Sequence, residues 1–405
     1  MSDLYVSSGY DQASMPPFGP IGIITHTANK EFVKKVSDVL FEKRSVRVHK
    51  NSNPYVNSPG YCRSDYIIDS TLNRYDNGEG TFSLLESVRG HDMYIITDVL
   101  SHSYSYELVE GDHVISPDDH YRDLLRMITV LKGKAKRINV IMPFVYEGRR
   151  EKLDSHRESW DCAEMLKKLY ELGIANLIVF DPHDGRIENA VPLMSIEYPR
   201  CQFKLTSSLL NRFDFIKLDK QHTMVVCPDE TGVSRAIFYS SHLNLPMGIF
   251  YRDRDYTQKI NGEHPIKSFM FLGDDVKGKD ILLIDDMINS GNTMLRTADK
   301  LKQYGADHIF CLAPYGLFTN GLDVFDQAYE KGLISAVCCT NLIYRSPELL
   351  ERPWYIDANM IPYVARIIDA LNLDESIYDL INSTSRLTDL ASQMRIGEFL
   401  EFKDE

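Results

Sequence analysis

Two adjacent carboxylates and a short run of small polar residues are the part of this sequence best suited to chemistry. Asp285 and Asp286 directly follow the apolar run Ile281–Ile284, and the loop Asn289–Thr293 (NSGNT) precedes a helical pattern. A helix N-terminus offers unpaired N–H groups and positive dipole to a phosphate. Neighbouring carboxylates accept hydrogen bonds from vicinal hydroxyls. A phosphate plus a diol predicts a ribose phosphate as the ligand.

The elements around this stretch predict how it is positioned. Ile281–Ile284 shows no polar alternation, which is typical of a strand covered on both faces in a parallel sheet. Met294–Leu301 has helical spacing, and Gly305 supplies a C-cap. In open parallel sheets, ligands bind beyond the carboxyl ends of the strands. We therefore expect the acidic pair and the loop at such an edge.

The same alternation of buried strand and helix recurs along the chain. It predicts an α/β fold with two similar halves in tandem and a boundary near residues 196–206. The expected strands are Ile21–Ile24, Met93–Thr97, Ile138–Met142, Asn176–Phe180, Met224–Cys227 and His308–Leu312, and the expected helices include Asn29–Leu40, Ala163–Leu172 and Ile356–Leu371.

Length and composition limit the possible functions. A chain of 405 residues is long enough for two globular domains, and its net charge of −13 argues against nucleic acid or an anionic membrane as a partner. The seven cysteines show no C-x-x-C pair and no zinc spacing, so we expect reduced thiols and no structural zinc. Neither a signal peptide nor a membrane-spanning apolar stretch is found, which predicts a cytoplasmic protein.

The expected division of the chain has four parts. Residues 1–20 and 381–405 are predicted to be a flexible N-terminal tail and a C-terminal tail, and 21–200 and 201–380 are the two domains. Residues 44–73 are rich in turn formers and are interpreted as an insertion or a long loop. The helix Ile356–Leu371 could dock on either half.

From about Ile21 to about Ile377, the chain resembles the ribose-phosphate pyrophosphokinases, also called PRPP synthetases. The Asp285–Thr293 stretch is similar to the PRPP-binding motif that this family shares with the type I phosphoribosyltransferases. The resemblance implies two tandem phosphoribosyltransferase-like domains, each a mostly parallel sheet flanked by helices. It also implies transfer of the β,γ-diphosphoryl group of ATP to the 1-hydroxyl of ribose 5-phosphate, with Mg²⁺, in a homo-oligomer that is at least a dimer with a shared ATP site.

The resemblance implies an ATP-binding group in the first half. In RYDNGEG, Tyr75 stands in the place of an aromatic that stacks on adenine, and Asn77 and Glu79 stand in the places of two acidic residues that read its edge. In MPFVYEGRREK, Arg149 takes the place of an arginine that meets the ATP phosphates, and Arg150 replaces a glutamine.

Two further motifs imply the polyphosphate and metal contacts. The segment Asp181–Asp184 (DPHD) is similar to the family's DLH motif, in which the histidine, here His183, acts in catalysis and helps to hold magnesium. PDETGVSRA resembles the pyrophosphate-binding loop, in which Asp229 would reach the metal and Gly232 would let backbone N–H groups approach phosphate.

The family's flexible catalytic loop carries a lysine and, two residues later, an arginine. Arg252 and Arg254 occupy these places. Arginine differs from lysine in reach, geometry and hydration, so Arg252 is the most serious departure from the family pattern.

The loop after the acidic pair also departs from the pattern. The resemblance assigns ribose 5-phosphate to Asp285, Asp286, Asn289, Ser290, Gly291, Asn292 and Thr293. Asn289 stands where the synthetases usually have aspartate, and Asn292 stands where glycine is common. A left-handed backbone at Asn292 would follow, which asparagine tolerates better than most residues.

Three alternatives stay open. Arg252, Asn289 and Asn292 favour a catalytically weak homologue that acts as a regulatory subunit. A phosphoribosyltransferase that consumes PRPP and a base would need only one such domain, and the ATP-loop signature would have no purpose in it. A scaffold protein without a ligand would not explain the ordered series of phosphate-type motifs.

Overall fold

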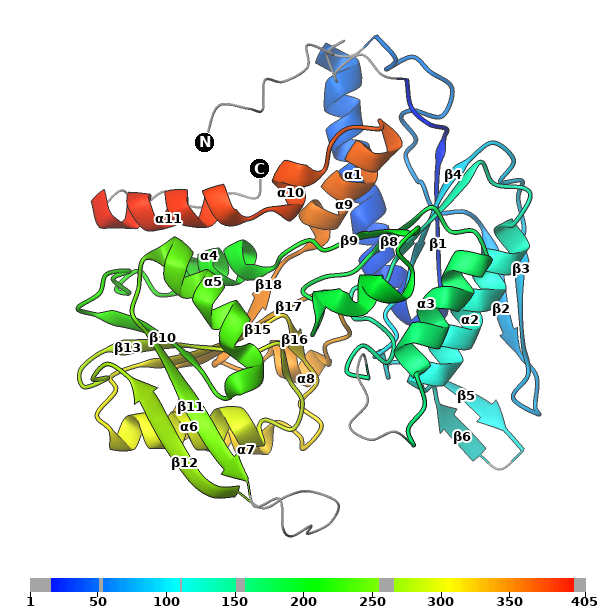
Figure 1. The fold of residues 1–405 in the computed structure, drawn as a ribbon. Coiled ribbons are helices and arrows are strands. Elements are labelled where there is room, and N and C mark those ends of the chain that lie inside the picture. Colours follow the sequence, from blue (N-terminus) through cyan, green and yellow to red (C-terminus); the bar gives the residue numbers. More distant parts are fainter. Residues whose placement is uncertain (1–15, 51–53, 110, 151–156, 255–265, 397–405) are drawn as a thin grey trace. The chain divides into compact units, whose positions relative to one another are not determined.

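The apolar runs of the sequence form two sheets, each in its own unit. The computed structural model describes residues 16–50, 54–109, 111–150, 157–254 and 266–396, without the side chains of 252–254, 266–268 and 395–396. Unit 1 comprises Met1–Val179, Asp184–Tyr198 and Ile361–Ile381, and unit 2 comprises Phe180–His183, Pro199–Met360 and Asn382–Glu405. Parallel sheets flanked by helices confirm the expected α/β class (Figure 1).

In unit 1, a parallel sheet has the strand order β1-β4-β7-β8-β9. Two antiparallel hairpins, β2–β3 and β5–β6, lie outside it. The elements described in this unit are β1 (Ile21–Thr25), η2 (Thr27–Asn29), α1 (Lys30–Lys50), β2 (Ser70–Arg74), β3 (Gly80–Leu84), β4 (Asp92–Ile96), β5 (Ser105–Leu108), β6 (Gly111–Val114), α2 (Pro117–Leu131), β7 (Arg137–Ile141), α3 (Asp161–Glu171), β8 (Asn176–Ile178), η3 (Gly185–Ala190), β9 (Ser195–Glu197), α9 (Ile361–Asn372) and α10 (Tyr378–Ile381).

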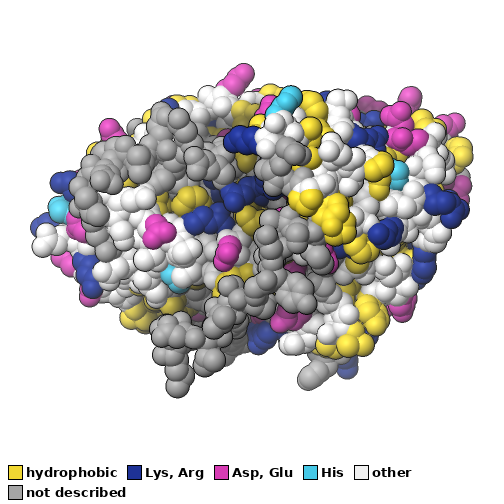
Figure 2. Space-filling model, turned by 90° about the horizontal axis from the view of Figure 1, so that it is seen from above, with side chains coloured by type: hydrophobic (Ala, Val, Ile, Leu, Met, Phe, Trp, Pro, Cys, Tyr) yellow, Lys and Arg dark blue, Asp and Glu magenta, His cyan; other side chains and the backbone are white. Residues whose placement is uncertain are grey.

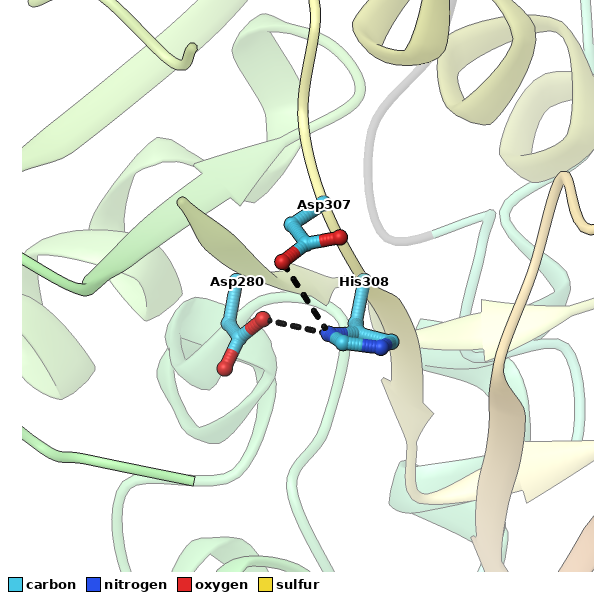
Figure 3. A group of neighbouring side chains, drawn as sticks. All are labelled: Asp280, Asp307 and His308. Carbon is cyan, nitrogen blue, oxygen red and sulfur yellow. Dashed lines mark hydrogen bonds and ion pairs between the residues drawn. The ribbon is translucent and has the colours of Figure 1, made fainter. Parts of the chain in front are cut away.

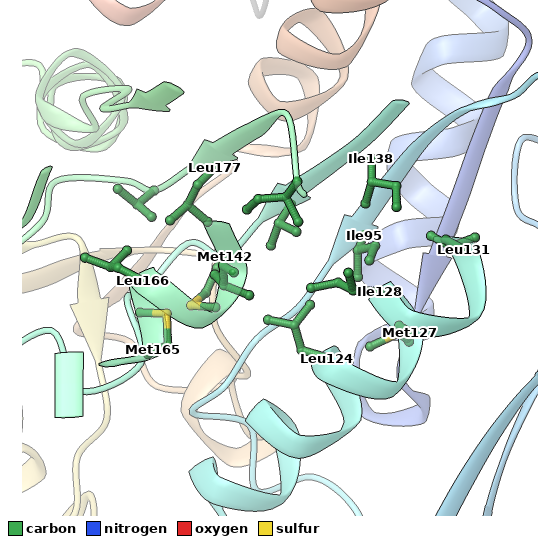
Figure 4. Packing of buried hydrophobic residues seen from close by; sticks show 14 of the residues in the cluster. Ile95, Leu124, Met127, Ile128, Leu131, Ile138, Met142, Met165, Leu166 and Leu177 are labelled. Atoms are coloured by element: carbon green, nitrogen blue, oxygen red, sulfur yellow. The ribbon is translucent and has the colours of Figure 1, made fainter. Parts of the chain in front are cut away.

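Alternation along the strands of unit 1 produces a core on each face of the sheet. Ile95 points to the face that α2 and α3 cover, and it belongs to the core cluster that includes Leu124 and Leu166 (Figure 4). Tyr94, the neighbouring residue, points to the opposite face and donates from its hydroxyl to Ile368 O of α9 (3.3 Å). Because both faces are covered, the central strands are mostly apolar, as the apolar runs predicted, with polar residues such as Asp92 and Asn139 as exceptions.

In unit 2, the larger sheet has the order β12-β11-β10-β13-β15-β17-β18 and is parallel except for the β11–β12 pair. Figure 1 shows α4, α5 and α11 on one face and α6 and α7 on the other. The elements described here are α4 (Gln202–Arg212), β10 (Thr223–Cys227), η4 (Glu230–Gly232), α5 (Val233–Leu243), β11 (Met247–Arg254), β12 (Ile266–Gly273), β13 (Asp280–Ile284), β14 (Met287–Ile288), α6 (Asn292–Gln303), β15 (Ile309–Ala313), β16 (Tyr315–Gly316), α7 (Asp323–Glu330), β17 (Ala336–Thr340), α8 (Pro347–Leu350), β18 (Tyr355–Ala358) and α11 (Thr384–Ile396).

The C-terminal part of the chain differs from the expected division. Ile356–Ala358 belongs to β18 and not to a helix, and the helix that follows, α9, is grouped with unit 1 although it falls within the expected domain 201–380. The expected tail 381–405 contains α11, whose Leu387 and Leu390 are buried. Sequence periodicity finds such helices, but it does not say which core receives them.

The N-terminal segments also differ from their predictions. The expected loop 44–73 begins inside α1, which extends to Lys50, and it ends inside β2. Residues 1–15 of the expected tail lie outside the described chain. Phe18, in the same expected tail, is held on unit 1, because its N–H donates to Asn372 O (2.7 Å) and the Arg137 guanidinium lies 4.0 Å from its ring centroid.

Figure 2 shows Lys and Arg interspersed with Asp and Glu over the face drawn. In the part of the chain that the structure describes, no helix has the length and apolar character needed to span a bilayer. Cys62 is half-buried, the other cysteines are buried, and all are free thiols, as their spacing predicted.

Candidate functional site

Asp285 and Asp286 stand at the carboxyl end of β13, in the middle of the unit 2 sheet. The Asp285 side chain is buried, with 8% of the residue exposed, and its Oδ1 accepts from the Asp286 N–H at 2.9 Å. Burial raises the pKa of Asp285 well above its usual value, and the charges of Asp286 and Asp229 raise it further. Three carboxyl groups thus share one edge of the sheet, where a bound cation or a hydroxyl donor would be stabilised.

Asp229 reaches the same edge because β10 pairs with β13 in parallel. Its Oδ1 accepts from the Thr231 N–H (3.0 Å) and hydroxyl (2.5 Å), which fixes the turn at the start of η4. The charges of Asp229 and Asp285 also act on the buried Cys227 thiol between them. Burial and these two charges raise the pKa of Cys227 to about 12, so the thiol stays protonated at neutral pH.

The loop Asn289–Thr293 leads into the N-terminus of α6, as predicted, but its left-handed residue is Gly291. Gly291 has φ +84°, and a Cβ there would lie 2.4 Å from the Phe325 ring. Asn292 is the first residue of α6, and it is not among the described non-glycine residues with positive φ. The expectation of a left-handed Asn292 is therefore wrong. At position 291 only glycine fits, because φ is positive there and because a Cβ would overlap the Phe325 ring.

Asn289 has a structural partner. Its Oδ1 accepts from the Thr319 hydroxyl at 3.1 Å, and its backbone O accepts from the Thr319 N–H at 2.9 Å. The residue thus ties the start of the loop to the chain that follows β16.

Gly232 directly precedes α5 and has an ordinary φ of −83°. A Cβ on Gly232 would lie 3.4 Å from Cys227 Cβ and 3.8 Å from Ile284 O, which the surrounding protein could accommodate. Neither backbone conformation nor internal packing therefore explains this glycine. Space for a ligand near the α5 N-terminus would explain it, which agrees with its predicted role.

The segment Phe180–His183 is grouped with unit 2, although it continues directly from β8. Asp181 has φ +39°, and its carboxylate accepts from the Cys201 N–H (2.8 Å) and from Gln202 Nε2 (2.7 Å). Phe180 O accepts from the Tyr315 hydroxyl at 2.6 Å. His183 is half-buried at the end of this doubly anchored segment.

The predicted ATP-binding residues all lie in unit 1. Tyr75, 56% exposed, Asn77 and Glu79 form the turn of the β2–β3 hairpin, where Asn77 Nδ2 donates to Glu79 Oε2 (3.0 Å). Arg149 and Arg150 are exposed beyond the end of β7. Exposed aromatic and guanidinium groups each suit a nucleotide, and the roles of these residues stay a prediction.

Arg252 and Arg254 lie on β11, opposite Phe269 and Ile266 of β12. Their side chains lie outside the described residues.

Asp229, Asp285 and Asp286 do not form a closed cage for a metal. Mg²⁺ prefers carboxylate oxygens, and it is usually held by one or two carboxylates together with substrate phosphates. Burial raises the pKa of Asp285, and the two neighbouring carboxyl groups raise it further, so a bound cation would offset a charge that the fold alone disfavours. The cluster therefore fits a magnesium ion that binds together with a polyphosphate.

A different group, Asp280, Asp307 and His308, lies at the amino ends of β13 and β15 (Figure 3). His308 Nδ1 is 2.8 Å from Asp280 Oδ1 and 3.8 Å from Asp307 Oδ2. The Lys302 ammonium donates to Asp307 O, so positive charge already lies beside the group. We interpret it as a hydrogen-bonded group at the sheet edge opposite to Asp285.

Family models match both halves of the chain. The N-terminal domain of ribose phosphate pyrophosphokinase matches residues 21–173, and the phosphoribosyl transferase domain matches residues 206–334. The chain belongs to the ribose-phosphate pyrophosphokinase family. These matches confirm the expected tandem phosphoribosyltransferase-like domains.

Individual relatives agree with this membership. A ribose-phosphate pyrophosphokinase of Wolinella succinogenes is 26% identical over 318 residues, which are 78% of this chain and 91% of the relative. The ribose-phosphate pyrophosphokinase 2 of Saccharomyces cerevisiae is 26% identical over 308 residues, 75% of this chain and 86% of the relative. A phosphoribosylpyrophosphate synthetase structure from Mycobacterium smegmatis superposes with a TM-score of 0.66 at 21% identity, covering 87% of this chain and 98% of that one, which shows the shared fold.

The sequence did not indicate the residues whose hydrogen bonds fix the positions of the site loops. Asp181, Tyr315 and Thr319 each bond to a segment that carries a predicted site residue. Tyr315 and Thr319 follow the buried strand β15 through a proline turn. That position at a strand's carboxyl end was the signal available in the sequence.

Proposed function

We propose that the chain is an ATP-dependent ribose-phosphate diphosphokinase that converts ATP and ribose 5-phosphate to AMP and PRPP. The observation that carries the proposal is the acidic cluster of Asp229, Asp285 and Asp286 beside the glycine-started α6 helix, in a chain of this family. In the reaction, the 1-hydroxyl oxygen of the sugar bonds to the β-phosphorus. The bond from that phosphorus to the α,β-bridging oxygen breaks, AMP leaves, and the hydroxyl proton is released.

The ribose 5-phosphate end of the site is assigned to unit 2. Asp285 and Asp286 accept hydrogen bonds from the vicinal sugar hydroxyls, and the N–H groups of Ser290–Thr293 bind the 5-phosphate at the α6 N-terminus. The rigid start of α6 fixes the phosphate, so the sugar is held at two points. Such positioning supplies a large part of catalysis in phosphoryl transfer.

The diphosphate donor is assigned to the remaining predicted site residues. Asp229 and His183 would hold a Mg²⁺ ion, and the bound ion would supply charge neutralisation for the polyphosphate. The N–H groups near Gly232 contact phosphate, and Tyr75, Asn77, Glu79, Arg149 and Arg150 bind ATP. Arg252 and Arg254 offset the charge that develops on the bridging oxygen. Family membership also supports a cytoplasmic homo-oligomer, at least a dimer, in which subunits share the ATP site.

The test is an assay of the purified full chain with ATP, Mg²⁺ and ribose 5-phosphate over a range of inorganic phosphate, with AMP and PRPP as the measured products. We expect one AMP for each PRPP. Absence of AMP at every phosphate concentration would overturn the catalytic proposal.

The same preparation separates the alternatives. If calorimetry detects ribose 5-phosphate binding while no AMP forms, the regulatory homologue is favoured, as Arg252 in the lysine's place suggests. Pyrophosphate released from PRPP and a purine without ATP would favour a phosphoribosyltransferase.

A further inference from the structure

Two site segments of unit 2 form hydrogen bonds with one short segment, Tyr315–Thr319. The first is the ribose 5-phosphate loop. Strand β14, which leads into it, pairs in parallel with β16 through Met287 and Ile288, and Leu317 N–H donates to Ile288 O at 2.8 Å. The Thr319 bonds to Asn289 extend this contact into the loop.

The second of these segments carries His183. The Tyr315 hydroxyl donates to Phe180 O at 2.6 Å, and Tyr315 itself is 2% exposed. Two residues, Asp181 and Pro182, separate Phe180 from His183. On its other side, the segment is held by the Asp181 carboxylate on Cys201 N–H and Gln202 Nε2. Tyr315 is therefore the side chain through which β16 holds the His183 segment.

We propose that Tyr315 is a positioning residue for the proposed diphosphoryl transfer, because its hydroxyl fixes the His183 segment relative to the ribose 5-phosphate loop. The inference rests on the proposed function of that site. The attacking hydroxyl belongs to the sugar that the loop holds, and the β-phosphorus belongs to the chain that His183 helps to hold. A backbone contact that sets the spacing of these two segments therefore sets the distance between the reacting atoms.

Tyr315→Phe keeps the ring and removes the donor to Phe180 O. Misplacement of reacting groups by about 1 Å can cost roughly 100-fold in rate. We expect kcat to fall about 10- to 100-fold, while KM for ribose 5-phosphate changes less than about 2-fold, because the β14–β16 backbone bonds remain. Hydrogen exchange should rise in a peptide covering Phe180–Asp184 and stay unchanged in one covering Met287–Thr293.

Two further variants make the result specific. Tyr355 carries a buried hydroxyl without a partner in the described structure, so Tyr355→Phe is the matched control and should leave kcat and exchange unchanged. Thr319→Val removes the exposed bond to Asn289 and should raise KM for ribose 5-phosphate with little change in kcat, and Thr319→Ser should restore the wild-type KM.

The outcomes separate this inference from the proposed function. If the wild type makes AMP and Tyr315→Phe keeps its kcat, the positioning role is wrong and the proposed function stands. An equal loss of kcat and of ribose 5-phosphate binding would also overturn the role, because it would indicate general damage. If the wild type makes no AMP, the proposed function fails, and hydrogen exchange in Tyr315→Phe tests the anchoring by itself. Unchanged exchange at Phe180–Asp184 would overturn the anchoring by Tyr315, and increased exchange there would support it.

Discussion

At the scale of single residues, the site holds a carboxyl group, Asp285, whose ionisation does not stabilise the folded protein. Asp285 is buried beside two other carboxylates, and its pKa is raised well above the usual value because burial and those charges oppose ionisation. A folded-state pKa above the unfolded one means that the folded protein binds more protons between the two pKa values. Stability is then lost as the pH rises through that window. Such strain at a ligand site is common, and ligand binding relieves it.

Asp285→Asn should therefore stabilise the protein without ligand and disable the site. We expect the Tm at pH 7.5 to rise, by about 2 to 4 °C for each kcal/mol gained, and AMP formation to fall by roughly 10²- to 10³-fold, the size of effect seen when one key site group is lost. Thermal unfolding and the AMP assay measure the two effects. An unchanged or lower Tm would contradict the electrostatic interpretation. Asp38→Asn, on the exposed face of α1, serves as control for a general charge effect.

His26 and His120 form a second buried titratable group, in unit 1. Their ring centroids are 4.3 Å apart, and both His26 nitrogens are buried without a partner in the described structure. Burial lowers the pKa of His26 well below its usual value, and His120 lowers it further, against a smaller opposing contribution from the Asp98 backbone. Burial also lowers the pKa of His120. Burial thus favours the neutral form of both rings in the folded protein.

Acid should therefore destabilise unit 1 before the carboxylates titrate. The unfolded chain takes up protons at these histidines below about pH 6.5 and the folded chain does not, so the unfolding free energy should fall as the pH drops from 7 to 5. His26→Asn should flatten this dependence in urea unfolding curves, while the exposed His49→Asn should not. A slope that is equal in all three proteins would contradict the prediction, because His26 would then bind the same number of protons in the folded and unfolded states.

At the scale of elements, a glycine directly precedes both α5 and α6, and the two glycines are explained by different constraints. Gly291 precedes α6 with φ +84° and a Cβ position that overlaps the Phe325 ring. Gly232 precedes α5 with an ordinary φ and room for a Cβ at 3.4 Å from its nearest neighbour. The first glycine is required by the fold, whereas the second is free to serve a ligand.

Gly291→Ala and Gly232→Ala should consequently fail in different assays. We expect Gly291→Ala to destabilise unit 2 by more than about 1 kcal/mol, because alanine is strained at positive φ and overlaps Phe325. Gly232→Ala should leave the Tm within about 2 °C and raise KM for ATP. Thermal unfolding and steady-state kinetics distinguish the variants. If Gly232→Ala unfolds at a lower temperature with normal KM, the glycine has only a packing role.

At the scale of the molecule, residues Ile361–Ile381 belong to unit 1 although they follow most of unit 2 in the sequence. The anchor is Asp369 of α9, 1% exposed, which accepts from Arg44 Nε of α1 at 2.9 Å and lies within 3.1 Å of the Arg47 and Lys43 side chains. Burial alone would raise the pKa of Asp369, but the charges of Arg44, Arg47 and Lys43 outweigh it and lower the pKa. Residues 325 apart in sequence therefore form one buried charged network.

Breaking this network should destabilise unit 1. Asp369→Ala leaves Arg44 buried without its counter-charge, and removing one partner of a buried pair typically costs about 3 to 5 kcal/mol. Asp38→Ala breaks the exposed Lys34–Asp38 pair and should cost less than about 1 kcal/mol. Urea unfolding measures both. A cost for Asp369→Ala as small as that of the exposed pair would mean that α9 is held by apolar packing alone.

The sequence by itself determined the α/β class, the buried strands, and the place of Asp285, Asp286 and the NSGNT loop at a strand end. Uninterrupted apolar runs and helix-start signals are local, and they persist whatever the strands pair with. The structure placed Asp229 beside Asp285, gave the left-handed position to Gly291 instead of Asn292, returned α9 to unit 1, and set the Tyr315 hydroxyl on Phe180 O. Each of these depends on which segments meet in space. That is decided by packing of the whole core, which no single stretch of sequence contains.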